Sequence, residues 1–218
     1  MNLGLNSSSI QRMNTGLVFD LLRKHQASTR TELARITGLT KATISNIVNS
    51  LIDIELLHEY PMESIGVGRR SIGLKINPDR FHLIQLRITN KKFYIGRYNL
   101  EGTEYEYYTK KYDPFAFLSN EILLSIKEYI KNMMKADNEI LGIGISLPGP
   151  YHSGKYLAEI GELENWGDIN ICEEIEKEFN IPVYVENDAN VGALGEWWLD
   201  GSITNEDTLI YITTATGT

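Results

Sequence analysis

The sequence predicts an α/β protein with a separate, mainly helical domain at its N-terminus. Apolar residues recur at helical spacing in the first part of the chain, whereas apolar and polar residues alternate with the period of β-strands from Phe81 onward. The charge changes in the same region. Residues 1–77 contain nine Lys/Arg and six Asp/Glu, while the whole chain of 218 residues has a net charge of −8. We therefore expect a basic domain, residues 1–77, followed by an acidic domain, residues 78–218.

Composition argues against several classes of protein. No apolar run approaches the ~18 residues that a membrane span needs, and the opening MNLGLNSSSIQRMN lacks a basic segment followed by an apolar one. The only cysteine, Cys172, cannot form an internal disulfide or a site with several thiolates, and it is expected to act as a small hydrophobic residue. We expect a cytoplasmic protein that has no membrane partner.

Three helices are expected in close succession in the first domain. Apolar spacing predicts the first over roughly 10–25. Ser28 or Thr29 can cap a second, short helix in TELARITG, which Gly38 ends in the left-handed conformation. Thr40 can cap a third helix in KATISNIVNSLID. Its expected buried stripe consists of Ile44, Ile47, Val48 and Leu51.

A short helix, a turn containing glycine and a longer helix are typical of the helix-turn-helix motif. The second helix of that motif presents its N-terminal residues to base edges in the major groove of DNA. The residues expected there are Lys41, Ala42, Thr43, Ser45 and Asn46. The alternative is a plain three-helix bundle with polar outer faces.

A β-hairpin is expected after the third helix. Two strand-like runs, Leu56–Tyr60 and Ser71–Ile76, flank a glycine-containing loop with Arg69 and Arg70. A hairpin in this place would be the wing of a winged helix, and its two arginines could enter a minor groove or bind phosphates. The alternative is a solvated, charged turn.

The second domain is expected to begin with three antiparallel strands and to continue with alternating helices and parallel strands. In chain order these are strands in HLIQLRIT, FYIGRYNL and LEGTEYEYYT, a helix at about 115–134, the strand ILGIGISL, a helix near 172–179, the strand PVYVE, a helix near 189–198 and the strand TLIYITT. This succession describes one lobe of an actin-like, ribonuclease-H-like ATPase fold.

Segments along nearly the whole chain resemble the ROK family, which contains xylose-repressor-like and N-acetylglucosamine-repressor-like regulators alongside sugar kinases. RMN, TRTELARITGLTKATISNIVNSLI and GVGRRSIGL resemble the N-terminal domain of the ROK repressors. GIGISLPGPY, LENWGDINI and IPVYVENDANVGALGE resemble the sugar-binding domain, and the last of these is the most specific match.

The resemblance implies a sugar site in the second domain. The PGP segment, which includes Gly149, lines the sugar cleft in the family. Asn187 and Asp188 stand where family kinases bind sugar hydroxyls, with the aspartate also removing a proton from the attacking hydroxyl. A carboxylate just beyond the end of a strand also faces the crevice where open α/β sheets bind ligands. Asp188 can instead cap the helix that starts at Ala189, and the two roles need not exclude each other.

The same resemblance argues against phosphoryl transfer. ROK kinases carry Asp-x-Gly-Gly-Thr between their first two strands, whereas this chain has Arg87, Ile88, Thr89, Asn90 and Lys91. Arg87 removes the acid that organises the metal, and side chains at the glycine positions obstruct the approach of backbone to phosphate. We expect no enzyme, no catalytic residue and no metal site. The family's zinc motif would lie beyond Thr218, so no cofactor is expected in this chain.

Together these patterns favour a sugar-responsive transcriptional regulator, a repressor of carbohydrate-utilisation genes. Its expected partners are a double-stranded DNA operator, a sugar or sugar-phosphate effector and a second copy in a homodimer. Two alternatives stay open: a ROK-type sugar kinase with a DNA-binding appendage, and a ligand-independent DNA-binding protein whose second domain serves in dimerisation. The resemblance also implies a further lobe, and the sequence leaves open whether this chain is a fragment or naturally short.

Overall fold

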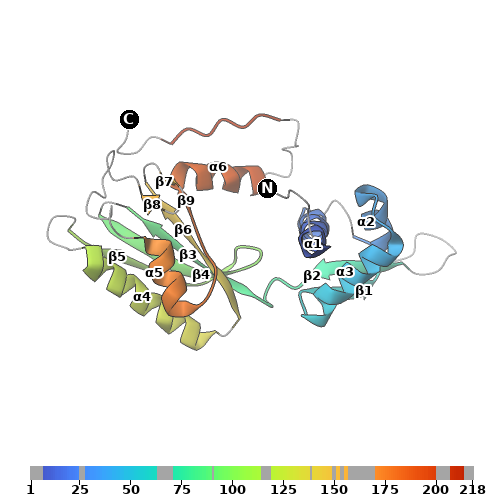
Figure 1. Ribbon diagram of the computed structural model, residues 1–218, viewed down its shortest axis with the longest axis horizontal. Helices are drawn as coiled ribbons and strands as arrows, with labels where there is room; N and C mark the ends of the chain where they lie inside the picture. Colours follow the sequence, from blue (N-terminus) through green and yellow to red (C-terminus); the bar gives the residue numbers. More distant parts are fainter. Residues whose placement is uncertain are drawn as a thin grey trace. The chain divides into compact units, whose positions relative to one another are not determined.

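The computed structural model describes residues 7–24, 28–62, 71–89, 91–113, 119–137, 139–148, 151–152, 155–156, 170–199 and 207–213. The chain divides into two compact units, Met1–Arg80 and Phe81–Thr218 (Figure 1). Each unit has its own hydrophobic core. The division lies three residues beyond the boundary expected after residue 77.

Three helices begin the first unit: α1 (Ser7–Arg23), α2 (Arg30–Thr37) and α3 (Lys41–Asp53). Local hydrogen bonds set the bounds of the two shorter ones. Thr29 accepts a hydrogen bond from the Glu32 N–H at the start of α2, and Gly38 ends that helix with a φ of 70°. Thr40 caps α3 by accepting from the Thr43 N–H.

A two-stranded antiparallel hairpin, β1 (Leu57–Pro61) and β2 (Ile72–Ile76), follows the helices. Leu57 and Leu74 point from the hairpin into the core that the helices form. The other members of this core are Val18, Leu21, Leu22, Leu33, Ile44, Ile47, Val48 and Leu51. The first unit is thus a helical domain closed by a hairpin, and the residues that join the two strands lie outside the described part of the chain.

A five-stranded mixed sheet forms the centre of the second unit. Its strands are β3 (His82–Ile88), β4 (Lys92–Asn99), β5 (Glu104–Lys111), β6 (Ile140–Leu147) and β9 (Val183–Asn187). They lie in the order β5-β4-β3-β6-β9. The first three pair antiparallel, whereas β6 runs parallel to both β3 and β9. The C-terminal ends of strands β3, β6 and β9 therefore lie at the same end of the sheet.

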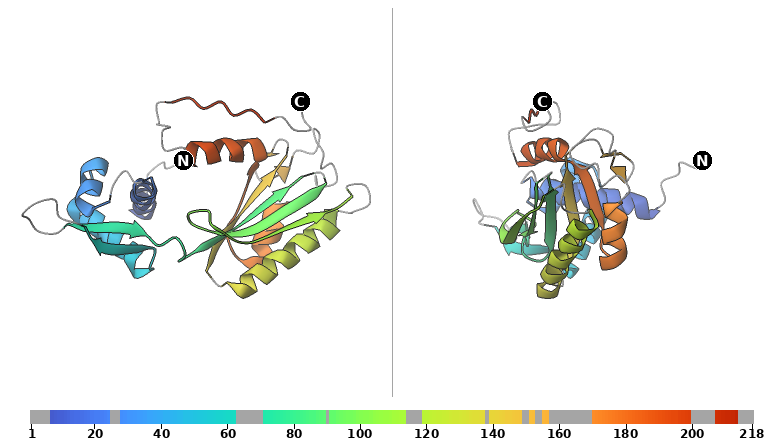
Figure 2. Two further views of the ribbon diagram at one scale, coloured as in Figure 1. Left: turned by 180° about the vertical axis from the view of Figure 1, so that it is seen from behind. Right: turned by 90° about the vertical axis from the view of Figure 1, so that its left-hand side faces the viewer.

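Helices cover both faces of this sheet. The helices α4 (Ser119–Ala136) and α5 (Ile171–Phe179) pack on one face, and α6 (Asp188–Leu199) lies on the other (Figures 1 and 2). Ile126, Ile130 and Met133 of α4 are buried against Ile84, Leu86 and Ile95 of the sheet. A short antiparallel pair, β7 (Tyr151–His152) and β8 (Lys155–Tyr156), follows β6.

The strand expected in TLIYITT is not present in the described residues 207–213, so that prediction is wrong for them. A strand requires a neighbouring strand with which to exchange hydrogen bonds, and the sheet order includes none at this segment. Ile210 and Ile212 are instead largely exposed, while the Tyr211 ring lies close to Gly192 of α6. The β-prone composition is therefore not sufficient to form a strand here.

Candidate functional site

The start of α3 forms a polar, exposed surface on the first unit. Lys41, Ala42 and Asn46 are exposed, and Thr43 and Ser45 are partly exposed. The buried stripe of Ile44, Ile47, Val48 and Leu51 occupies the opposite side of the helix, because residues three or four apart share a helix face. The structure thus brings the five residues that the sequence predicted for DNA recognition together on one exposed surface.

Arg30 holds α3 against its neighbours, a role that the sequence did not indicate. Its guanidinium donates to the Asn49 side chain at 2.9 Å and to the Glu59 carboxylate of β1 at 2.8 Å. A third hydrogen bond reaches the Ser45 carbonyl at 3.4 Å. Arg30 therefore links the start of α2 to both α3 and the hairpin. Since Glu59 is 29 residues away, no local motif could reveal this contact.

Glu32 stabilises the start of α2. The Ser28 N–H donates to its carboxylate at 2.8 Å, and the hydroxyls of Ser28 and Thr29 donate at 3.2 and 3.1 Å. The Ser28 backbone bond in particular lowers the pKa of Glu32. This reciprocal capping fixes the point at which α2 begins, and Arg30 is the first residue of that helix.

Arg69 and Arg70, the expected contacts at the hairpin tip, lie outside the described residues, as does Gly149. Their predicted roles therefore stay predictions. Asn187 and Asp188 are described, and they stand where β9 ends and α6 begins.

Asn187, and not Asp188, caps α6. Its side-chain oxygen accepts hydrogen bonds from the Ala189 N–H at 2.9 Å and from the Asn190 N–H at 3.2 Å. An N-cap oxygen bonds to N–H groups two and three residues later, and Asp188 is itself the first residue of the helix. The alternative role considered for Asp188, as the cap of this helix, is therefore wrong. Its carboxylate has another partner.

That partner is Arg87 on β3. The Nη2 atom of Arg87 lies 3.8 Å from an Asp188 carboxylate oxygen, and the two side chains are 52% and 27% exposed. In the register of the sheet, Arg87 is opposite Ser146 of β6, whose neighbour on β9 is Glu186. The carboxyl ends of three parallel strands thus present a cation, a hydroxyl and carboxylates. Such groups can donate hydrogen bonds to the hydroxyls of a polyol and accept hydrogen bonds from them.

Hydrogen bonds from Thr89 close the turn that follows Arg87 and connects β3 to β4. The Thr89 hydroxyl donates to the Lys92 carbonyl at 2.8 Å, and the Thr89 N–H donates to the same carbonyl at 2.9 Å. Asn90 lies outside the described residues. Lys91 is exposed. The Thr89 side chain therefore serves in closing the β3–β4 connection.

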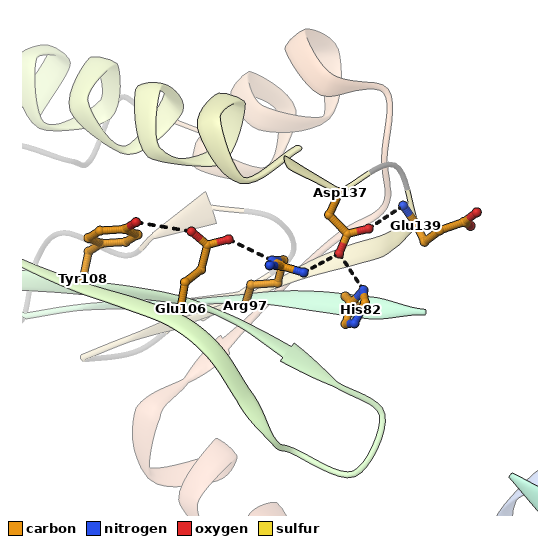
Figure 3. Close-up of polar contacts among 6 residues, drawn as sticks. All are labelled: His82, Arg97, Glu106, Tyr108, Asp137 and Glu139. Atoms are coloured by element: carbon orange, nitrogen blue, oxygen red, sulfur yellow. Dashed lines mark hydrogen bonds and ion pairs between the residues drawn. The ribbon is translucent and has the colours of Figure 1, made fainter. Parts of the chain in front are cut away.

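A second polar cluster, which the sequence did not indicate, lies at the other end of the sheet (Figure 3). One Asp137 carboxylate oxygen lies 2.5 Å from His82 Nδ1 and 2.6 Å from Arg97 Nη1. Arg97 Nε also donates to Glu106 at 2.8 Å. Burial would lower the pKa of Arg97, but its bonds to Glu106 and Asp137 outweigh this effect and raise it. These contacts tie β3, β4 and β5 to the segment after α4, which is a structural role.

Neither a metal site nor a membrane-spanning helix is found in the described part of the chain. Its residues contain no group of three or more His, Cys, Asp or Glu side chains that could hold a metal ion. None of its helices combines the length and apolar character needed to cross a bilayer.

Comparisons of the sequence and of the structure with known proteins match the same family over much of the chain. A model of the ROK family matches residues 88–218. The xylose repressor of Bacillus subtilis (strain 168) is 28% identical over 210 residues, covering 95% of this chain and 54% of that protein. The DNA-binding transcriptional dual regulator NagC of Escherichia coli (strain K12) is 26% identical over 211 residues, covering 94% and 51%.

A crystal structure of a ROK family transcriptional regulator, described as a homolog of the E. coli MLC protein, superposes with a TM-score of 0.71 and 26% identity. The match covers 87% of this chain and 49% of that one. The chain thus spans about half the length of the curated relatives it matches. Because the family model covers more than half of the sequence, the chain belongs to the ROK family.

Proposed function

We propose that this protein is a sugar-responsive transcriptional repressor that acts in the cytoplasm. In this proposal the first unit binds operator DNA as a winged helix, and the second unit binds a sugar or sugar phosphate. The observation that carries the proposal is the exposed face at the start of α3, with Lys41, Ala42 and Asn46 on a helix whose other side is buried. The names of the repressors that match nearly the whole chain support it.

In the proposed DNA complex, α3 enters the major groove. Asn46 can form paired hydrogen bonds with an adenine, and Thr43 and Ser45 can contact bases through their hydroxyls. Lys41 would bind a phosphate, and Arg69 and Arg70 would bind the backbone or a minor groove from the hairpin tip. Arg30 supports this geometry because it holds both α3 and β1, from which the tip extends.

In the proposed sugar complex, Asp188 accepts hydrogen bonds from ligand hydroxyls, and Asn187 and Gly149 would contact the same ligand. Arg87 supports a binding role over a catalytic one, because it places a cation beside the carboxylate that would have to accept a proton. Closure of the β3–β4 turn by Thr89 also differs from a phosphate-binding glycine turn. The proposal requires no catalysis and no cofactor from this chain.

Regulation requires that the sugar bind two states of the protein with different affinity. By linkage, a sugar that weakens operator binding by some factor is itself bound more weakly by the DNA complex, by the same factor. A homodimer would place two copies of α3 on a symmetric operator, with the half-site spacing set by the dimer.

The direct test is fluorescence anisotropy with DNA sequences selected by the protein from a random pool. Affinity is measured at two salt concentrations, with xylose, N-acetylglucosamine and their phosphate esters added in turn. Salt-sensitive, sequence-specific binding that one sugar weakens supports the proposal. Equal affinity for selected and random DNA would contradict the DNA-recognition part. Specific binding that no sugar changes would favour a ligand-independent DNA-binding protein.

A further inference from the structure

The strand β5 forms one edge of the sheet in the second unit. It has eight residues and pairs with β4 on one side, and the described part of the chain provides no strand for its other side. An edge strand of this length presents unpaired N–H and C=O groups that can bind another strand. Tyr105, Tyr107 and Tyr108 are 47%, 42% and 43% exposed along it.

Charges of opposite sign stand at the two ends of this strand. Glu104 and Glu106 are near its beginning, whereas Lys110 and Lys111 end it. An identical strand running antiparallel would therefore bring its acidic half against this strand's basic half. A parallel copy would bring like charges together.

The two lysines have no acidic partner among the described residues. Lys110 donates to the Ser125 hydroxyl at 2.6 Å, which is a neutral group. Lys111 stands directly opposite Lys92 of β4, and like charges in such a pair are unfavourable. The basic half of β5 therefore lacks the carboxylates that a second β5 would supply.

We propose that β5 pairs antiparallel with β5 of a second copy of this chain. Opposite residues in an antiparallel pair lie on the same face of the sheet, so a two-fold axis between identical strands must place one residue opposite itself. With Tyr108 at this position, Glu106 of each copy is opposite Lys110 of the other. The two tyrosines form an aromatic pair at the centre. The two sheets become one continuous sheet.

Local geometry agrees with this register. The β4–β5 ladder shifts only near Arg97 and Tyr98, so residues 106–111 of β5 form a regular run. Glu106 and Tyr108 lie on the same side of β5, and Glu106 contacts Arg97 there (Figure 3). Arg97 and the Tyr108 hydroxyl therefore both donate to the Glu106 carboxylate on the face of β5 that also carries Lys110.

Two alternatives are less consistent with these observations. Lysines on an edge strand often prevent pairing, but here the acids of an antiparallel copy would neutralise them. The other edge of the sheet, β9, has five residues with one acid, Glu186, and no cation, so it lacks this complementarity.

Sedimentation equilibrium tests the pairing through its charges. The unmodified chain should be a dimer, and replacing both Lys110→Glu and Lys111→Glu should weaken the dimer by roughly tenfold or more. A second variant carries Glu104→Lys and Glu106→Gln, where the amide still accepts a hydrogen bond from Arg97. Neither variant should dimerise well alone, but an equimolar mixture should form heterodimers. Circular dichroism confirms that both are folded.

Disulfide trapping tests the register. In a Cys172→Ser background, Tyr108→Cys should form a disulfide-linked dimer on mild oxidation, because opposite Cβ atoms lie about 4.5–5.5 Å apart. Tyr184→Cys, which is also exposed but lies on β9, is the matched control and should form no disulfide-linked dimer under the same oxidation. A monomeric unmodified chain would overturn the proposal. A dimer whose stability the charge changes do not alter would also overturn it. So would a disulfide-linked dimer formed by Tyr184→Cys and not by Tyr108→Cys.

Discussion

The Arg87 guanidinium lies 3.8 Å from the Asp188 carboxylate, and this pair joins β3 to the start of α6. The pair is partly solvent-exposed, so it contributes only about 0–1 kcal/mol to stability. A ligand that bonds to Asp188 therefore displaces a weak interaction. In the proposed function, Arg87 and Asp188 together form a polar site that accepts and donates hydrogen bonds.

Asp188→Asn should weaken the response to sugar. Hydrogen bonds to a charged group are worth about 1.5–3 kcal/mol, so the sugar concentration that half-releases the operator should rise at least tenfold. Operator affinity without sugar should not change, because Asp188 lies in the other unit. Anisotropy titrations measure both quantities. Glu128→Gln, an exposed acid on α4, is the matched control. Loss of operator binding without sugar would show that Asp188 is structural.

Asn46→Ala and Lys41→Ala should have different effects on DNA binding. Loss of Asn46 should lower the preference for operator over random DNA by about 1–3 kcal/mol. Loss of Lys41 should weaken binding to both DNAs and reduce the slope of log affinity against log salt by about 1. Lys131→Ala, an exposed lysine of α4, should leave the slope unchanged. If Asn46→Ala lowered the affinity for operator and random DNA equally, Asn46 would have no role in base recognition.

Ile126→Ala should destabilise the second unit by about 2–5 kcal/mol, because Ile126 is fully buried between α4 and the sheet and its truncation leaves a cavity. Leu124→Ala removes a similar side chain from the exposed side of the same helix, and its effect should stay within about 0.5 kcal/mol. Urea unfolding followed by circular dichroism measures both. Comparable losses for the two variants would contradict the packing of α4 described above.

Glu32→Gln should destabilise the first unit in a pH-dependent way. The Ser28 N–H lowers the pKa of Glu32 below its ordinary value of 4.5, so the folded state favours the charged carboxylate. This contribution is present above about pH 4.5 and is lost as the pH falls through the lowered pKa. The difference in urea midpoint between Glu32→Gln and the unmodified chain should thus be present at pH 7 and shrink toward about pH 3. A constant difference across this range would show that the charge of Glu32 is not involved.

Features that depend on neighbouring residues followed from the sequence. Gly38 and Thr40 were identified as helix ends because their cap hydrogen bonds span only a few residues. Strand β3 followed from alternating polarity, because Ile84, Leu86 and Ile88 on one of its faces are buried. The alternative of Asp188 as the cap of α6 placed the cap one position too late, since Asn187 and Asp188 are both good caps and only the path of the chain out of β9 selects between them.

The sequence by itself therefore determined the helices and the longer strands as far as α6, the buried stripe of α3 and the candidate recognition residues on its other side. Only the tertiary structure decided that Arg30 joins α3 to Glu59 and that Arg87 faces Asp188. It also decided that, among the described strands, none pairs with the outer side of β5 or with residues 207–213. Helix caps and hydrophobic periodicity depend on residues that are close together in the sequence, so residue type alone indicates them. Strand order and long-range ion pairs arise from burying all the apolar faces at once, and no short segment contains that information.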